Sequence, residues 1–315
     1  MNGIINVFKE TDMTSFDVVA ILRRVLQIRR IGHSGTLDPM ATGVLPVLVG
    51  KATRLTDYLT SYDKEYIFTM RFGVETDTLD RTGTILREES LESIDPHQLE
   101  DTLPLFLGKL LQKPPMYSAV KINGKKLYEY ARQGKTVERK ARAIEIYALE
   151  LLAMKGTEAT LRCRCSKGTY IRQLIADLAA AMGTCAMMTS LRRTKVGPFV
   201  EAEAISIAQL KEMDRLTAES LLQPADRAVL HFPSVVLEGK EGWRASQGQK
   251  ITLGAERIRK ASLSAPEEAG TEDQAHLLLS KEHIVRVYAD SVFLGLGVWE
   301  GTCLKMKKVI AESIG

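Results

Sequence analysis

Between Asn2 and about Leu230, apolar segments typical of β-strands alternate with amphipathic segments typical of helices, and no long polar linker separates them. Such an alternation places helices against a sheet, so it predicts an α/β mixed domain in which a mixed sheet is flanked by helices. A chain of 315 residues has room for a second, smaller domain. We therefore expect a first domain over residues 1–230 and a second one over residues 231–315.

Local signals define several elements of the first domain. Thr14 or Ser15 is a predicted N-cap, because apolar residues follow it at helical spacing. Strict alternation over residues 66–72 predicts a strand with one apolar face. Residues 143–165 form a predicted hairpin, and residues 171–182 have the spacing of a helix.

After about His231 the pattern changes to short strands at short spacing, which predicts a small β-barrel. One of these strands is expected over residues 276–279. Residues 261–275 are acidic and rich in proline and alanine, and this composition predicts a mobile loop.

Basic charge is concentrated in residues 109–142, where ten lysines and arginines face two glutamates, although the whole chain has a net charge of only +4. Tyrosines lie between these cations, and cations with stacking side chains are typical of an RNA-binding surface. An ordinary solvated loop is the alternative interpretation. Within this segment, residues 117–122 are a predicted strand that leads into a tight turn at Asn123-Gly124.

Other patterns exclude several classes of protein. The four cysteines are too irregular for a disulfide framework or a zinc site, which favours a reducing cytoplasm. The histidines are scattered, so we expect no metal centre. Residues 43–50 followed by Lys51 resemble a phosphate loop, but the glycine spacing is too long and Ala52 stands where a hydroxyl is needed. Because the longest near-apolar run is too short to span a bilayer, and the first residues do not resemble a signal peptide, we expect neither membrane insertion nor export.

The most informative stretch starts at Gly32 and reads GHSGTLDPMATGVLP. Pro39 disfavours helical geometry at Asp38, so the carboxylate is expected at the apex of a loop, and Gly32 and Gly35 are expected to let another backbone approach closely. An aspartate in an ordinary turn is the alternative, and His33 taken alone is more often a structural or surface residue.

The same stretch, continued as GHSGTLDPMATGVLPVLVGKAT, resembles the catalytic motif of the tRNA pseudouridine-55 synthases, the TruB family. Further blocks follow in the order of that family: KEYIFTMRFGVETDTLDRTG, PPMYSAVKINGKKLYEYARQG, SKGTYIRQL and LRRTKVG. Together they cover most of residues 1–230. In the C-terminal part, SQGQKI, IVRVYAD and VFLGLGVWEG resemble the PUA domain, a small RNA-binding barrel.

The resemblance implies isomerisation of a uridine in the T loop of tRNA, with Asp38 as the essential group. Asp38 would attack the sugar C1′ or the base, or assist loss of the C2′ proton, and the sequence leaves these routes open. The resemblance also implies that Arg172 holds this carboxylate ionised and that Tyr66 stacks on the base and helps to move the C5 proton. Without the resemblance, Arg172 could equally be a surface residue and Tyr66 a core residue. The reaction needs no redox cofactor, metal or phosphate donor.

The resemblance further implies how the RNA is held. His33 would take the space of the flipped nucleotide, and Tyr170 and Leu191 would complete an apolar wall around the base. Residues 109–142 would clamp the T arm as a thumb, and the PUA-like barrel would contact the acceptor end of the tRNA. The cations expected to bind RNA in the thumb are Lys121, Lys125, Lys126 and Arg132.

One departure from the family concerns Lys9. The corresponding lysine of the family is usually followed by proline and glycine, whereas Lys9 is followed by Glu10-Thr11. This leaves the role of Lys9 open. Two other functions also stay open: a non-catalytic protein that binds or folds tRNA on the same scaffold, and a glycosidase that hydrolyses nucleosides with paired carboxylates. Asp77 and Asp80 are the candidates for such a pair, although they look more like loop-capping residues.

Overall fold

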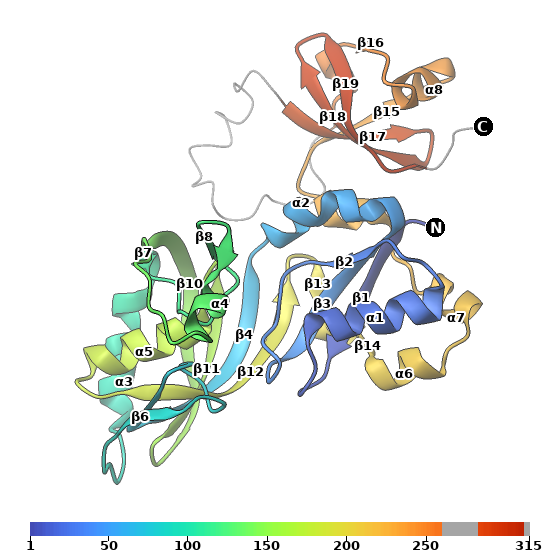
Figure 1. Ribbon diagram of the computed structural model, residues 1–315. Coiled ribbons are helices and arrows are strands. Elements are labelled where there is room, and N and C mark those ends of the chain that lie inside the picture. The colour runs from blue at the N-terminus through green and yellow to red at the C-terminus, as the bar shows by residue number, and fades with distance from the viewer. Residues whose placement is uncertain (260–282, 312–315) are drawn as a thin grey trace. The chain divides into compact units, whose positions relative to one another are not determined.

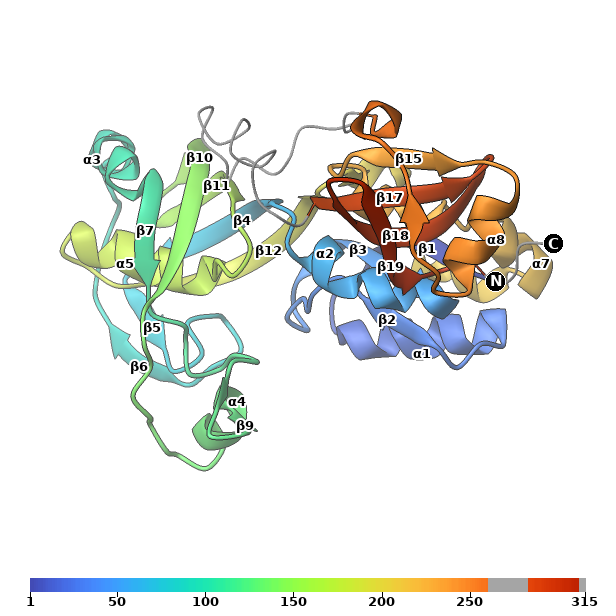
Figure 2. The same cartoon turned by 90° about the horizontal axis from the view of Figure 1, so that it is seen from above.

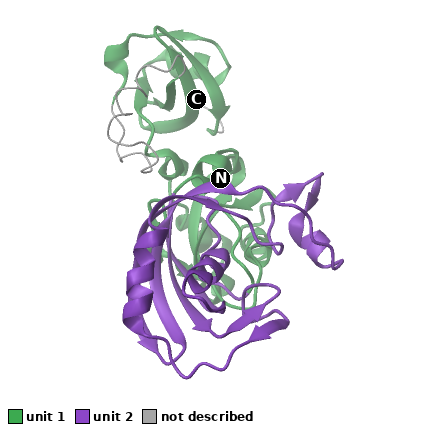
Figure 3. Cartoon of the chain, turned by 90° about the vertical axis from the view of Figure 1, so that its left-hand side faces the viewer, with its two compact units in different colours: residues 1–39, 43–62, 196–315 green, residues 40–42, 63–195 purple. Residues whose placement is uncertain are grey.

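The computed structural model describes residues 1–259 and 283–311, so the loop and the strand expected over 261–279 lie outside the described residues. The chain forms two compact units (Figure 3), which we describe separately. Unit 1 consists of Met1–Pro39, Gly43–Tyr62 and Val196–Gly315, and unit 2 consists of Met40–Thr42 and Asp63–Lys195. Within the described ranges, no helix is both long enough and apolar enough to cross a membrane.

Unit 1 contains a sheet with helices packed against it (Figure 1). Its strands are β1 (Gly3–Lys9), β2 (Ile31–His33), β3 (Thr42–Val49) and β14 (Ile205–Ser206). β1 pairs in parallel with β14 and antiparallel with β3, and β2 pairs antiparallel with β3, so the sheet is mixed. The helices of this part of unit 1 include α1 (Ser15–Leu26), α2 (Thr56–Thr60), α6 (Ile207–Glu212) and α7 (Arg215–Ser220).

α1 begins where the sequence predicts it. The backbone N–H of Asp17 donates to the Thr14 side chain at 3.1 Å, and the Thr14 N–H donates to the Asp17 carboxylate at 2.7 Å, so the cap is reciprocal. The buried residues Val18 and Leu22 of α1 pack in one cluster with Val47 of β3. Burial of this apolar stripe against the sheet stabilises the helix and fixes its orientation.

Unit 2 contains strands in the order β12-β4-β11-β10-β7. These are β4 (Lys64–Phe72), β7 (Gly108–Gln112), β10 (Arg142–Lys155), β11 (Glu158–Cys165) and β12 (Ala186–Val196). The predicted hairpin and the predicted alternation along residues 66–72 are confirmed. The smaller elements are β5 (Val74–Thr76), β6 (Ile85–Glu88), α3 (Pro96–Thr102) and α5 (Ile171–Ala181).

The connection between β7 and β10 projects from the rest of unit 2 (Figure 2). It carries β8 (Lys121–Ile122), β9 (Lys125–Lys126) and α4 (Leu127–Ala131). Asn123 and Gly124 have φ of 51° and 80°, as the expected tight turn requires. The strand expected over residues 117–122 is wrong except for its last two residues, because the carbonyls of Ser118 and Val120 accept hydrogen bonds from the start of α4 instead.

The C-terminal part of unit 1 is a second sheet with the order β15-β17-β18-β19-β16, which confirms the strands predicted there within the described residues. Its strands are β15 (Ser234–Leu237), β16 (Ile251–Thr252), β17 (His283–Ala289), β18 (Val292–Glu300) and β19 (Cys303–Val309). α8 (Lys240–Ser246) packs against this sheet.

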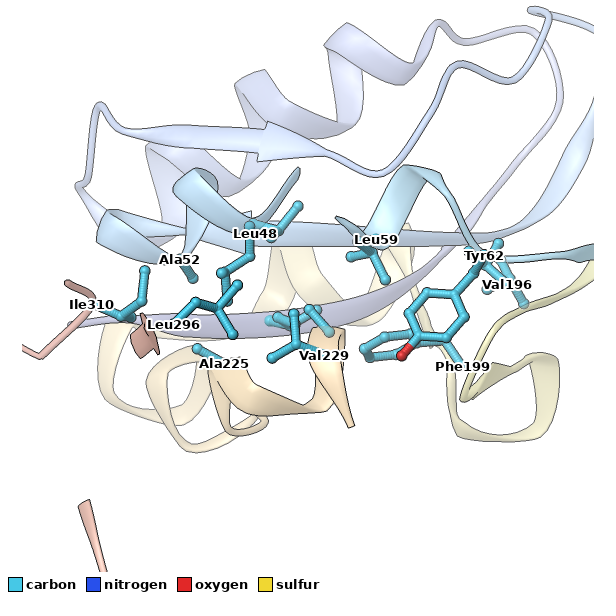
Figure 4. Close-up of a cluster of buried hydrophobic side chains, with 14 residues drawn as sticks. Leu48, Ala52, Leu59, Tyr62, Val196, Phe199, Ala225, Val229, Leu296 and Ile310 are labelled. Carbon is cyan, nitrogen blue, oxygen red and sulfur yellow. The ribbon is translucent and has the colours of Figure 1, made fainter. Parts of the chain in front are cut away.

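Side chains of this sheet belong to a hydrophobic core that also contains residues of β3 and of the segment after it (Figure 4). Leu296 and Ile310 belong to the same buried cluster as Leu48 and Ala52, and the Asn2 side chain donates to the Ile310 carbonyl at 3.1 Å. Unit 1 therefore includes residues on both sides of the expected boundary at residue 230, and that boundary stays a prediction.

A polar cluster lies next to this core. The Tyr62 hydroxyl and His231 Nδ1 are 2.7 Å apart, and the buried Arg286 donates to the Phe232 carbonyl at 3.0 Å. Burial first, and the positive charge of Arg286 next, lower the pKa of His231 to about 4. The neutral imidazole is therefore the form that the folded protein accommodates.

Candidate active site

Asp38 lies in the loop between β2 and β3, is half-buried, and is followed by a turn. Both backbone groups of its neighbour Leu37 are bonded to the Ser15 hydroxyl of α1, with Leu37 N–H donating at 2.9 Å and Ser15 donating to the Leu37 carbonyl at 3.3 Å. On the other side, Lys9 Nζ donates to the Pro39 carbonyl at 3.0 Å. Asp38 therefore sits between two residues whose backbone is anchored to β1 and α1.

Lys9 itself is fully buried and also donates to the carbonyls of Glu10 at 2.8 Å and Met13 at 2.6 Å. Three carbonyl dipoles compensate for the desolvation of the ammonium group. Lys9 therefore anchors the backbone next to Asp38 although no proline and glycine follow it, and its role in the reaction stays open.

The two glycines before Asp38 differ from expectation. A Cβ on Gly32 would only meet the Thr53 methyl group at 3.8 Å, an ordinary contact, so the expected close approach of a backbone is wrong. Gly35 is needed for another reason, because its φ of +123° is unfavourable for other residues. The Gly35 N–H donates to His33 Nδ1 at 3.3 Å, which orients the half-buried imidazole.

Tyr66 lies on β4 with 9% of its surface exposed, and burial raises its pKa to about 12. The neighbouring Arg193 on β12 forms a hydrogen bond with it and opposes this rise. Leu191, which the sequence assigns to the wall around the base, is also buried on β12. Tyr66 is therefore in contact with a buried cation that the sequence interpretation did not include.

Arg172, the second residue of α5, is only 5% exposed, so the alternative interpretation as a surface residue is wrong. Its Nη1 donates to the Thr78 carbonyl and its Nη2 to the Tyr117 carbonyl, both at 2.8 Å. The guanidinium also lies 3.7 Å from the Asp80 carboxylate. Asp38 belongs to unit 1 and Arg172 to unit 2, and their pairing stays a prediction.

Asp77 and Asp80 cap their own loop, as the sequence predicts. Asp80 Oδ1 accepts from the N–H of Thr82 at 3.0 Å and from its hydroxyl at 2.6 Å, and Asp77 Oδ1 accepts from the Thr84 N–H at 2.8 Å. The Tyr117 hydroxyl donates to Asp77 Oδ2 at 3.2 Å. These carboxylates organise a loop that also holds Arg172.

Tyr170 precedes α5 and is held by a side chain that the sequence interpretation missed. Its N–H donates to Gln112 Oε1 at 2.8 Å, and Gln112 Nε2 donates back to the Tyr170 carbonyl at 3.1 Å. Gln112 is buried on β7, where its polar groups need partners. Its partner is distant in sequence, so only the fold could reveal this pair.

Most of the expected RNA-binding cations are exposed, namely Lys121, Lys125 and Arg132, and Lys126 is half-buried. Lys126 Nζ and the Arg132 guanidinium each lie 5.3 Å from the centre of the Tyr128 ring. These cation–π contacts place two positive charges around one aromatic ring in the projecting segment. Positive charge and an aromatic ring thus lie together in the projecting segment.

Ser15 and Arg193 are further residues that the sequence interpretation did not select. Arg193 follows Leu191 by two positions, so alternation along a strand would have placed both on one face. The sequence predicts for Ser15 only a possible role as a helix cap, because no local signal indicates that its hydroxyl bonds to Leu37, 22 residues further along the chain.

Two family models match the chain. The TruB family pseudouridylate synthase N-terminal domain matches residues 23–171, and the tRNA pseudouridylate synthase B C-terminal domain matches residues 172–230.

The chain is 38% identical to the tRNA pseudouridine synthase B of Azoarcus sp. strain BH72, over 100% of this chain and 97% of that protein. It is also 38% identical to the protein of the same name from Clostridium perfringens strain SM101, over 99% of this chain and all of that protein. Among solved structures, a chain of a Cbf5-Nop10-Gar1 complex matches with a TM-score of 0.70 and 26% identity, over 98% of this chain and 85% of that one. This chain belongs to the TruB family of pseudouridylate synthases.

Proposed function

We propose that this protein isomerises uridine 55 in the T loop of tRNA to pseudouridine and that Asp38 is its essential group. Two relatives that match along nearly their whole length are tRNA pseudouridine synthases. The observation that carries the assignment of Asp38 is its double anchoring, since Ser15 holds Leu37 and Lys9 holds Pro39. A carboxylate between two fixed neighbours is preorganised for reaction with a bound nucleotide.

The reaction breaks the N1–C1′ bond, turns the base, forms a C5–C1′ bond, releases the C5 proton to solvent and leaves N1 to take up a proton from solvent. Every non-hydrogen atom of the product comes from the substrate and the proton lost from C5 is balanced by the one gained at N1, so no redox partner, metal or phosphate donor enters the balance. Asp38 attacks C1′ or the base, or assists loss of the C2′ proton. Arg172 orients Asp38, and Tyr66 stacks on the base and helps to remove the C5 proton.

RNA binding precedes this chemistry, because the target base is inside the folded T arm and must be flipped out. His33 fills the vacated space, and Tyr170 and Leu191 line the pocket for the base. The segment 109–142 clamps the T arm with exposed cations, and the PUA-like sheet contacts the acceptor end. We place this activity in the cytoplasm, in agreement with four cysteines that are all free thiols.

The test uses a tRNA transcript with tritium at uridine C5 and the full-length protein, with EDTA and without added cofactor. Wild type is expected to release tritium, and Asp38→Asn is expected to release none while it binds tRNA with a similar Kd. The matched control is Asp101→Asn, because Asp101 is exposed on α3 and should not affect the rate. Mapping of pseudouridine should locate it in the T loop.

Other outcomes would overturn the proposal. Tight tRNA binding without tritium release by wild type would favour the non-catalytic RNA-binding protein. Release of free uracil would favour the nucleoside glycosidase. An equal loss of binding and turnover in Asp38→Asn would show that the role assigned to Asp38 is wrong.

A further inference from the structure

Tyr66 and Arg193 lie on neighbouring strands of unit 2, and side-chain contacts show how these strands are aligned. The Thr194 hydroxyl donates to Glu65 Oε1 at 2.7 Å, and the Thr189 hydroxyl donates to the Thr69 carbonyl at 3.2 Å. The two strands therefore run antiparallel, so a higher residue number on β4 lies beside a lower residue number on β12. Since side chains alternate between the faces of a sheet, Tyr66 and Arg193 lie beside each other on the face opposite Glu65 and Thr194.

Burial on that face is nearly complete. Arg193 is 1% exposed and Tyr66 is 9% exposed, and a hydrogen bond joins their side chains. Cys163 of β11 pairs with Tyr66 from the other side and is fully buried. The phenol is therefore enclosed by its neighbours, and the hydrogen bond from Arg193 is formed in a water-poor environment, where it is stronger than at the surface.

The chemistry of arginine gives this hydrogen bond a direction. A guanidinium has N–H donors and no acceptor, so the Tyr66 oxygen must accept from Arg193. The phenolic O–H must then point to an acceptor other than Arg193. A glutamine or a water at this position would not fix the direction, because each can also accept a hydrogen bond.

We propose that Arg193 is a positioning residue of the isomerisation: it binds the Tyr66 oxygen as a donor and so fixes the direction in which the Tyr66 O–H is presented during turnover. This proposal rests on the proposed function, in which Tyr66 contacts the flipped base. The Arg193–Tyr66 contact itself is a property of the folded protein and can be measured without RNA.

Charge on the same face supports this assignment. Burial raises the pKa of Tyr66, whereas the charge and the hydrogen bond of Arg193 lower it. Lys64, two residues before Tyr66 on the same face, has its pKa lowered to about 8 by burial first and by Arg193 next. A neutral residue at position 193 would therefore raise the pKa of Tyr66 and leave the fold with one buried cation fewer.

The first measurement is spectroscopic and uses full-length protein containing 3-fluorotyrosine. The signal of position 66 is identified by its loss in Tyr66→Phe, and fluorotyrosine titrates at a lower pH than tyrosine. Arg193→Met is expected to raise the apparent pKa of this residue and to change its chemical shift. Arg192→Met is the matched control, because Arg192 is exposed on the opposite face of β12 and should change neither quantity.

The second measurement is the single-turnover rate on saturating tRNA, together with the Kd for tRNA and the unfolding temperature. We expect Arg193→Met to lower the rate by about tenfold to a hundredfold with a Kd within about threefold of wild type. Arg193→Lys should recover part of the rate, because an ammonium also only donates. If Arg193→Met does not fold, Arg193→Gln replaces it in both measurements.

The proposal is overturned if Arg193→Met keeps the wild-type rate or leaves the fluorine titration unchanged. It is also overturned if rate, tRNA binding and unfolding temperature fall together, since that pattern describes a purely structural residue. Failure of the proposed function is distinguishable, because wild type would then release no tritium from tRNA. The fluorine titration would still decide whether Arg193 binds Tyr66.

Discussion

Lys9 Nζ lies 3.0 Å from the carbonyl oxygen of Pro39, the residue after Asp38. The ammonium joins the end of β1 to the loop that carries the candidate catalytic carboxylate, and it also donates to two carbonyls of the chain that leads into α1. A single buried side chain thus determines the relative position of three segments. This geometry predicts that Lys9 supports Asp38.

Replacement of Lys9 by methionine should therefore affect both stability and turnover. The variant removes three part-buried hydrogen bonds to backbone carbonyls and replaces a fully buried ammonium group, which should lower the free energy of unfolding by about 2–4 kcal/mol. It also releases Pro39, so the rate of tritium release should fall even in protein that is fully folded. Urea unfolding and the tritium assay measure the two effects, with Lys211→Met as a control at an exposed lysine. An unchanged rate in folded Lys9→Met would contradict the supporting role.

Ser15 allows an independent test of the other anchor. Ser15→Ala removes both hydrogen bonds to Leu37 and leaves a buried N–H unsatisfied, which should cost about 1–2 kcal/mol of stability. Because Leu37 precedes Asp38, the single-turnover rate should fall more than the affinity for tRNA. Ser220→Ala, at an exposed serine of α7, is the matched control. A loss of affinity without a loss of rate would show that this anchor serves RNA binding instead.

The sequence predicts elements well where their signals are local. The start of α1 is an example, because the reciprocal cap between Thr14 and Asp17 involves residues three positions apart. β12 shows the opposite case: it contains Arg193 and other charged residues, so its pattern does not indicate a buried strand. Arg193 is buried beside Tyr66, which comes from a distant part of the chain. Long-range partners of this kind decide the site and leave no periodic signal.

In the candidate site, too, local motifs are predictable from the sequence and long-range partners are not. Asp38 and Arg172 are identifiable from motifs, because each lies in a block that resembles a known family. The partners of Arg172 are backbone carbonyls of Thr78 and Tyr117, which could be supplied by any residue type and so carry no sequence signal. For this reason, the sequence alone could not predict that Arg172 is buried.

His231 predicts how stability depends on pH. Its pKa is lowered to about 4 in the folded protein, below the value of 6.5 for a free imidazole. The unfolded chain therefore binds more protons between these values, and stability should decrease as the pH falls from 6.5 toward 4. Urea unfolding at several pH values should show a smaller decrease for His231→Gln than for wild type. A control at the exposed His97, His97→Gln, should follow wild type, and identical slopes in His231→Gln would contradict this origin of the acid sensitivity.

The cations of the projecting segment predict the salt dependence of tRNA binding. Lys125 and Arg132 are exposed there, and each phosphate that such a residue neutralises releases counterions when RNA binds. Lys125→Gln and Arg132→Gln should each weaken binding and reduce the slope of log Kd against log salt concentration by about one. The single-turnover rate at saturating tRNA should stay near that of wild type, because the reacting groups are unchanged. Lys211→Gln, outside this segment, controls for the general loss of a positive charge. If the slope is unchanged in both variants, the segment does not bind phosphates. If the slope is reduced and the saturated rate also falls, the segment helps to place the target uridine in addition to binding phosphates.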